Sequence, residues 1–162
     1  VILLFLASKY SFSSKKKLKL IQMILIHDLA ESVIGDMTPE AISSAKKKEM
    51  EDEAFSFIIN NLPPNNLKRD LLNIWKEYNE HSSFDSELVH IIDKMEMLLQ
   101  ADFYFSNRQN IQFSQIAPFK KSVSTFVDKD KYKSDSDINS TLQINQIKKL
   151  TEIKEILAYL CK

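Results

Sequence analysis

Glycine and proline are scarce in this chain, and their scarcity limits the folds that it can adopt. The 162 residues contain one glycine and four prolines, so few positions carry the turn signals that a many-stranded sheet requires. Long segments instead repeat their apolar residues at helical spacing. With 44% hydrophobic and 10% aromatic residues, the chain can bury a substantial core. The sequence therefore predicts an all-α fold, organised as a single domain over residues 1–162.

The most informative segment, His27–Pro39, reads HDLAESVIGDMTP. The apolar spacing around its start predicts one helix over Leu20–Ile34. In such a helix His27 and Glu31, at i and i+4, share a face, and Asp28 lies about 100° around the axis from His27. His27, Asp28 and Glu31, which can each bind a metal or carry a proton, would then lie on one side of the helix.

The only glycine, Gly35, is predicted to end this helix from a left-handed C′ position, which puts Asp36 just beyond the helix end. Thr38–Glu40 predicts a new helix start, with threonine as N-cap, proline at the first helical position and an acid in the first turn. This helix is expected to run from Pro39 to Leu62. Its charged block Lys46–Glu53 predicts a solvated face with i, i+4 ion pairs.

His27 and Asp28 have two interpretations. A lone histidine near the end of an apolar helix is usually a hydrogen-bonded core residue. The preceding run Ile21–Ile26, however, is almost wholly apolar and predicts a buried helix. Burying even a neutral polar group without a partner costs roughly 2 to 7 kcal/mol, so both side chains require a metal or another partner. A divalent cation would satisfy them together.

Beyond these arguments, HDLAESVIGDMTPE resembles the signature of the HD-domain metal-dependent phosphohydrolases, in particular their 5′-deoxynucleotidase branch. A second block, VHIIDKMEMLLQ, supplies the aspartate that this family places on a later helix, here Asp93. The similarity extends over about residues 1–102. It implies an HD-domain helical bundle in which His27, Asp28 and Asp93 are the metal ligands.

Asp93 also has an interpretation that needs no metal. It belongs to a helix predicted over Ser83–Phe105, where it lies off the main apolar stripe but on a side that carries other apolar residues. Such a helix is expected to be buried centrally. Without the resemblance, a buried salt bridge to Lys94 or Arg108 would explain Asp93 better than a cation does.

The resemblance implies a hydrolase that acts on a phosphomonoester, with a deoxynucleoside 5′-monophosphate as the substrate. One imidazole nitrogen with carboxylate oxygens suits Mn²⁺, Co²⁺ or Fe²⁺ and does not choose among them. The cation would acidify a water molecule and polarise a phosphoryl oxygen. Glu31 would orient or deprotonate the water, and Asp36 would protonate the leaving 5′-oxygen or hold the phosphate, although these two roles could be exchanged.

The N-terminal run Val1–Leu6, VILLFL, is expected to be the end of a buried helix whose beginning is missing. In the family that the sequence resembles, this helix begins several residues upstream and carries the first metal-binding histidine, which this sequence does not contain. The alternative function is therefore a non-catalytic HD-fold scaffold that binds a nucleotide or another protein. A helix with a histidine shortly before Val1 would favour the enzyme.

Apolar periodicity organises the rest of the chain. A helix over Leu67–Asn79 places Trp75 in the core rather than on a base-stacking platform. His81 and His90 are assigned surface or structural roles. The segment DKDKYKSDSDINST at residues 128–141 is polar and low in complexity, which predicts a flexible insert. An amphipathic helix over residues 142–162 packs on the core or on a partner subunit, as in a homodimer.

Charge and cysteine content restrict the partners and the compartment. The formal net charge is zero, so no global field attracts nucleic acid or an anionic membrane, and neither is expected as a partner. The single cysteine, Cys161, permits no intrachain disulfide and suits a reducing compartment. We therefore expect a cytoplasmic protein.

Overall fold

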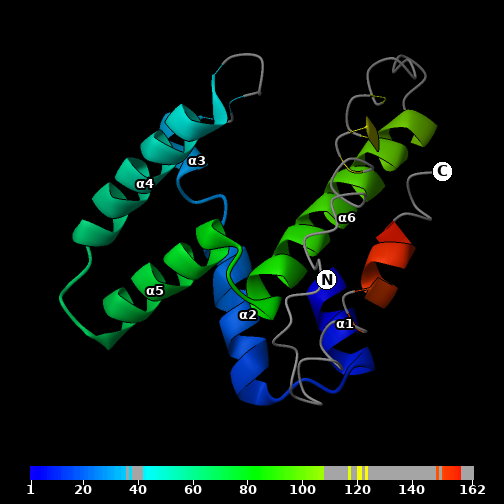
Figure 1. Ribbon diagram of the computed structural model, residues 1–162, viewed down its shortest axis with the longest axis horizontal. Helices are drawn as coiled ribbons and strands as arrows, with labels where there is room; N and C mark the ends of the chain where they lie inside the picture. The colour runs from blue at the N-terminus through cyan, green and yellow to red at the C-terminus, as the bar shows by residue number, and fades with distance from the viewer. Residues whose placement is uncertain are drawn as a thin grey trace, which may run out of the picture. The chain divides into compact units, whose positions relative to one another are not determined.

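The computed structural model describes residues 1–35, 37, 42–107, 117, 120–121, 123, 149 and 151–157. Every regular element in these ranges is an α-helix, which confirms the all-α class (Figure 1). Residues 117, 120–121, 123, 149 and 151–157 are helical, and no helix in the described ranges is long and apolar enough to cross a membrane. The helices labelled in Figure 1 are α1 (Ile2–Lys9), α2 (Ser14–Ile26), α3 (Glu31–Ile34), α4 (Ser44–Asn60), α5 (Asn66–Glu80) and α6 (Phe84–Asn107).

The chain divides into two compact units. The first contains Val1 and Leu3–Ser86, and the second contains Ile2 and Glu87–Lys162, so the division falls within α6. The single-domain organisation stays a prediction. The predicted insert at residues 128–141 and the predicted helix start at Thr38–Glu40 lie outside the described residues.

Helices α1 and α2 each bury one face in the first unit. The N-terminal apolar run is helical, but Leu4 and Phe5 are exposed, so this helix is buried on one side only. Ser13 caps the start of helix α2, because its hydroxyl accepts a hydrogen bond from the backbone amide of Lys16 at 3.3 Å. The buried residues of the two helices recur at helical spacing: Leu3, Leu6 and Ala7 in α1, and Leu20, Met23 and Ile26 in α2.

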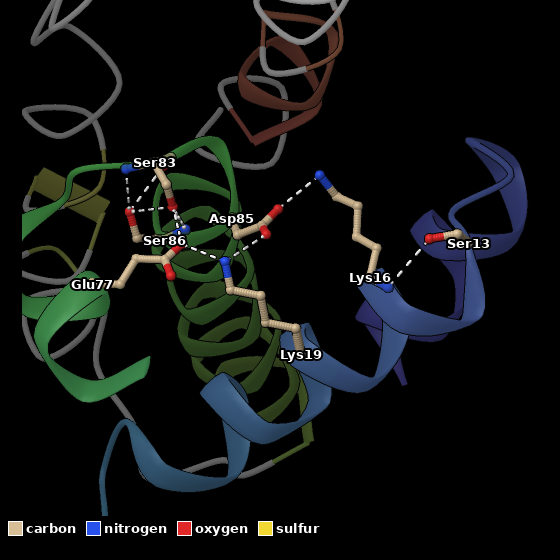
Figure 2. Close-up of polar contacts among 7 residues, drawn as sticks. All are labelled: Ser13, Lys16, Lys19, Glu77, Ser83, Asp85 and Ser86. Atoms are coloured by element: carbon tan, nitrogen blue, oxygen red, sulfur yellow. Dashed lines mark hydrogen bonds and ion pairs between the residues drawn. The ribbon is translucent and has the colours of Figure 1, made fainter. Parts of the chain in front are cut away.

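A polar network ties α2 to α5 and to the first turn of α6 (Figure 2). Lys19 Nζ lies 2.7 Å from Glu77 Oε1 and 3.2 Å from Asp85 Oδ2. Lys16 Nζ lies 2.7 Å from Asp85 Oδ1, as an ion pair rather than an aligned hydrogen bond. The Ser83 hydroxyl donates to the same oxygen of Glu77. Two lysines of one helix thus neutralise two half-buried carboxylates of its neighbours.

Helices α4 and α5 pack through an aromatic pair. The rings of Phe55 and Trp75 stack with their centroids 4.1 Å apart and their planes 6° from parallel. Trp75 Nε1 donates a hydrogen bond to Asp52 Oδ1 at 2.7 Å, so its polar atom is satisfied inside the core. Only 6% of Trp75 is exposed. The prediction that Trp75 is a core residue is confirmed.

The single helix predicted over Leu20–Ile34 is wrong, because the structure interrupts it. Helix α2 ends at Ile26, residues 27–30 form turns, and α3 begins at Glu31. A continuing α-helix would use the Ile24 carbonyl for the backbone amide of Asp28. The ring of His27 takes that carbonyl instead, with Nδ1 2.6 Å from Ile24 O. The backbone then tightens, and the amides of Leu29 and Glu31 bond three residues back, each at 3.0 Å.

Gly35 ends α3 with a backbone that only glycine adopts readily. Its φ of 78° is positive as predicted, but its ψ of 161° is extended rather than left-handed helical. Its amide still donates to Glu31 O at 2.8 Å. Helix α4 then starts at Ser44 with Ser43 as its N-cap, so the helix predicted over Pro39–Leu62 begins later than expected.

The second unit buries the central part of α6. Leu88, Val89 and Ile91 are fully buried, and because they point in different directions around the helix axis, α6 packs on more than one side. Glu87 is also buried, and its Oε1 lies 3.1 Å from Lys154 Nζ. Ile153 and Leu157 are fully buried, as the predicted C-terminal amphipathic helix requires. The other residues of that predicted helix lie mostly outside the described part.

Gly35→Ala should lower the free energy of unfolding by about 1–3 kcal/mol, because a φ near +78° combined with an extended ψ strains any side-chain-bearing residue. No neighbouring atom would obstruct the added Cβ, so backbone strain alone is tested. Chemical denaturation of this variant should be compared with that of Val33→Ala, an exposed position in the same short helix. Equal free energies of unfolding for the two variants would contradict the backbone assigned to Gly35.

Lys19→Met should lower the free energy of unfolding by about 1–2 kcal/mol, since partial solvent exposure of Lys19 weakens its two ion pairs. The exposed Lys15→Met is the matched control and should change little. Burial opposes the charge of Lys19, but hydrogen bonds to Glu77 and Asp85 raise its pKa above the ordinary 10.5.

A raised lysine pKa means that this contribution is fully present below pH 10.5 and is lost as pH rises through the folded value. Denaturation curves of wild type and Lys19→Met should therefore differ at neutral pH and converge at strongly alkaline pH. A stability difference that grows with pH would overturn the assignment.

Candidate functional site

His27 is oriented by the same hydrogen bond that ends α2. Because the Ile24 carbonyl can only accept, the Nδ1 atom of His27 carries the proton in this contact. The other ring nitrogen, Nε2, lies 3.0 Å from Asp28 Oδ2. The side chain of His27 is 15% exposed, and that of Asp28 is 66% exposed. His27 is therefore held by the protein backbone, whereas the carboxylate of Asp28 is accessible to solvent.

Tyr78 of α5 supports the imidazole from the side. The two ring centroids lie 5.9 Å apart at an interplanar angle of 76°, an edge-to-face contact. Helix α5 packs directly on α2, so Tyr78 is held by the same interface as the network of Lys19. The position of the His27 ring is thus determined by its own helix and by a neighbouring one.

The donor atoms of His27 and Asp28 fit a divalent cation. A histidine whose Nδ1–H donates to a backbone carbonyl presents Nε2 as a ligand, which is the usual arrangement at protein metal sites. Neighbouring ligands at about 2.1 Å from one octahedral cation lie about 3.0 Å from each other. The separation of Nε2 and Oδ2 is 3.0 Å. Within the described residues, no group of three or more His, Cys, Asp or Glu side chains is gathered closely enough to hold a metal.

Glu31 contacts Lys47, a residue that belongs to no sequence motif. Its Oε1 lies 2.9 Å from Nζ of Lys47 on α4, and Lys47 Nζ lies 3.5 Å from Oε1 of Glu51 one turn further along α4. The continuous helix on which the i, i+4 argument for His27 and Glu31 depends is interrupted between them, so a shared helix face does not position Glu31, and its place beside His27 stays a prediction. Glu31 is positioned from α4 instead.

The cluster of Glu31, Lys47 and Glu51 is largely buried. The three side chains are 26%, 28% and 21% exposed. Burial opposes the charge of Lys47, but the hydrogen bond and charge of Glu31, together with those of Glu51, raise its pKa above the ordinary value. Burial raises the pKa of the Glu51 carboxyl, with Lys47 acting in the opposite direction.

The prediction of a solvated charged face on α4 is therefore correct for one side only. Lys46 and Glu49 are exposed and pair at 2.6 Å. Lys47 and Glu51 form the expected i, i+4 pair, yet they face the protein. The i, i+4 spacing predicted the pair of Lys47 and Glu51. It did not predict the contact of Lys47 with Glu31, which is 16 residues away in the sequence.

Asp93 belongs to the second unit, so its convergence with His27 and Asp28 stays a prediction. Its Oδ2 lies 3.0 Å from Nζ of Lys94, and both side chains are 28% exposed. The salt bridge to Lys94 expected in the absence of a metal is thus present, whereas Arg108 lies outside the described residues.

The remaining candidates add no ligand to the described site. Asp36 lies outside the described residues. His90 is half-buried on α6, and His81 is exposed where it caps α5 from a left-handed conformation with φ 50° and ψ 36°. Both positions agree with the surface or structural roles predicted for them.

Known proteins resemble this chain at the level of both family and individual sequence. The profile of the HD domain matches residues 1–152. The 5′-deoxynucleotidase HDDC2 of Danio rerio is 36% identical over 92 residues, which are 56% of this chain and 46% of that protein. The human 5′-deoxynucleotidase HDDC2 is 36% identical over 85 residues, which are 52% of this chain and 41% of that protein.

A fungal relative gives the same picture. The 5′-deoxynucleotidase hdd1 of Schizosaccharomyces pombe is 36% identical over 91 residues, which are 54% of this chain and 46% of that protein. The chain thus spans less than half the length of each of these relatives. No solved structure is significantly similar to it.

Proposed function

The chain belongs to the HD-domain family, and from this premise we propose that it is a metal-dependent hydrolase that converts a deoxynucleoside 5′-monophosphate to a deoxynucleoside and phosphate. The substrate class comes from relatives that are named 5′-deoxynucleotidases. The single observation that carries the proposal is the pair of His27 and Asp28, whose donor atoms lie 3.0 Å apart with the histidine anchored through its other nitrogen.

His27 Nε2, an Asp28 carboxylate oxygen and the Asp93 carboxylate would hold the cation, which we assign to the Mn²⁺, Co²⁺ or Fe²⁺ class. When bound, a divalent cation there would polarise a phosphoryl oxygen and lower the pKa of a water molecule. Asp93 would exchange its contact with Lys94 for this role. The open side of Asp28 leaves room for the phosphate to approach.

Glu31 is the general base of the proposed reaction. It takes one proton from the attacking water, whose oxygen forms a bond to phosphorus while the bond from phosphorus to the 5′-oxygen breaks. Asp36 delivers one proton to the departing 5′-oxygen, so that a neutral deoxynucleoside and phosphate are released. The water and the substrate together supply every atom of the products, and no oxidant or reductant is needed.

Glu31→Ala should separate catalysis from metal binding. Because Glu31 acts on the water in this proposal, the variant should retain its metal and lose turnover by roughly 10²- to 10⁴-fold. His27→Ala should lose the metal and the activity together. Metal content and kcat are measured on the same preparations with a deoxynucleoside 5′-monophosphate, with Glu49→Ala and His81→Ala as exposed controls. Loss of metal from Glu31→Ala equal to that from His27→Ala would make Glu31 a ligand.

Asp93→Asn should lose phosphatase activity and metal retention, while circular dichroism shows nearly unchanged helicity. A charge removed from a cation site weakens metal binding more than it weakens the packing of α6. Unchanged hydrolysis by this variant would rule out the role assigned to Asp93. Tight nucleotide binding by the wild-type protein without any turnover, at saturating Mn²⁺ or Co²⁺, would favour the non-catalytic scaffold.

A further inference from the structure

We propose that Lys47 is a positioning residue for Glu31, which holds the carboxylate in the orientation that proton abstraction requires. This inference rests on the proposed function, because it assigns the role of Lys47 through Glu31. Its structural basis is the contact of 2.9 Å between Lys47 Nζ on α4 and Glu31 Oε1 on α3.

Glu31 needs support from outside its own helix. Helix α3 contains only four residues, Glu31–Ile34, none of which is fully buried, and its N-cap has no side-chain hydrogen bond. A helix of one turn has almost no intrinsic stability. The structure packs α3 against α4, and the ion pair with Lys47 fixes the first residue of α3 to that longer helix.

Lys47 is itself restrained, as a positioning residue must be. Its Nζ lies 3.5 Å from Glu51 Oε1, so a second carboxylate on the same helix limits the rotamers of the long lysine side chain. The side chains of Lys47 and Glu51 are about three-quarters buried, which reduces the screening of their charges by solvent. Burial opposes the charge of Lys47, but the hydrogen bonds and charges of Glu31 and Glu51 outweigh it and raise the pKa of Lys47 above the ordinary value, which keeps the lysine cationic.

The two carboxylate oxygens of Glu31 have different roles in this proposal. Lys47 contacts Oε1, and we assign the other oxygen, Oε2, to the attacking water. Loss of Lys47 would leave the carboxylate present but free to rotate. A displacement of about 1 Å in a catalytic group can lower the rate by about 10²-fold. The effect should appear in kcat rather than in substrate binding.

The test uses the metal-loaded protein with a deoxynucleoside 5′-monophosphate. Lys47→Met should lower kcat by about 10- to 100-fold, with KM and metal content within about twofold of wild type. Lys48→Met removes the same charge from an exposed neighbour on the same helix and should keep wild-type kcat. Lys47→Arg retains the cation and should restore most of the lost rate. A general loss of fold would change KM and metal content as well and would not be rescued by arginine.

A double variant decides whether Lys47 acts through Glu31. In the Glu31→Gln background, Lys47→Met should cause less than a twofold further loss, because the group that it positions is already disabled. Full additivity of the two losses, or wild-type kcat in Lys47→Met, would overturn the proposal. Should Lys47→Met not fold, Glu51→Gln provides the test: it keeps the cation but loosens it, and an unchanged kcat would count against the inference.

The wild-type protein separates this inference from the function on which it rests. Hydrolysis by wild type together with an unaffected Lys47→Met variant would overturn the positioning role alone. Absence of hydrolysis by wild type loaded with Mn²⁺, Co²⁺ or Fe²⁺ would overturn the proposed function, and the assignment of Lys47 with it.

Discussion

The hydrogen bond between His27 Nδ1 and the Ile24 carbonyl, at 2.6 Å, determines the local structure on which the candidate site depends. It occupies the acceptor that would have continued α2, so the chain tightens into turns and restarts as α3 at Glu31. It also fixes which nitrogen of the imidazole carries a proton in this contact, which presents Nε2 toward Asp28. This one contact thus explains both the orientation of His27 and the separation of Glu31 from α2.

Interhelical ion pairs connect several helices of the first unit. Lys19 joins α2 to Glu77 of α5 and to the start of α6 (Figure 2), and Lys47 joins α4 to Glu31 of α3. Isolated surface pairs contribute little to stability, but these pairs are partly buried and share their carboxylates or lysines. Within the first unit, these charges thus neutralise one another between helices. In the second unit, the pair of Glu87 and Lys154 follows the same principle.

Features that depend on local periodicity were predictable from the sequence. The helix from Asn66 to Glu80, the helix that contains Asp93, the Ser13 cap and the buried Trp75 all follow from apolar spacing and capping chemistry. The interruption after Ile26 was not predictable, because the apolar pattern continues through it and only the bond from the ring of His27 to the backbone reveals it. The backbone conformation of Gly35 was not predictable either, because a glycine indicates a positive φ but not the value of ψ that accompanies it.

In the candidate site too, local contacts were predictable from the sequence and tertiary contacts were not. Adjacent residues, His27 and Asp28, meet as their sequence suggests, since neighbours in a helix end have few alternatives. The contact of Glu31 with Lys47 is tertiary, and no pattern within either segment specifies it. The i, i+4 spacing of Lys47 and Glu51 indicated a pair but not the side of α4 that would be buried. Long-range electrostatic partners therefore require the structure, even where the family signature identifies the residues that they serve.

The central proposal is that His27, Asp28 and Asp93 would hold one divalent cation. The most direct measurement is a crystal structure of the Mn²⁺-loaded protein with anomalous diffraction collected at the manganese absorption edge. We expect a single anomalous peak within about 2.0 to 2.3 Å of His27 Nε2 and of one carboxylate oxygen each from Asp28 and Asp93. A peak that lacks Asp93 as a ligand, or Asp93 still paired with Lys94 beside an occupied site, would contradict the claim.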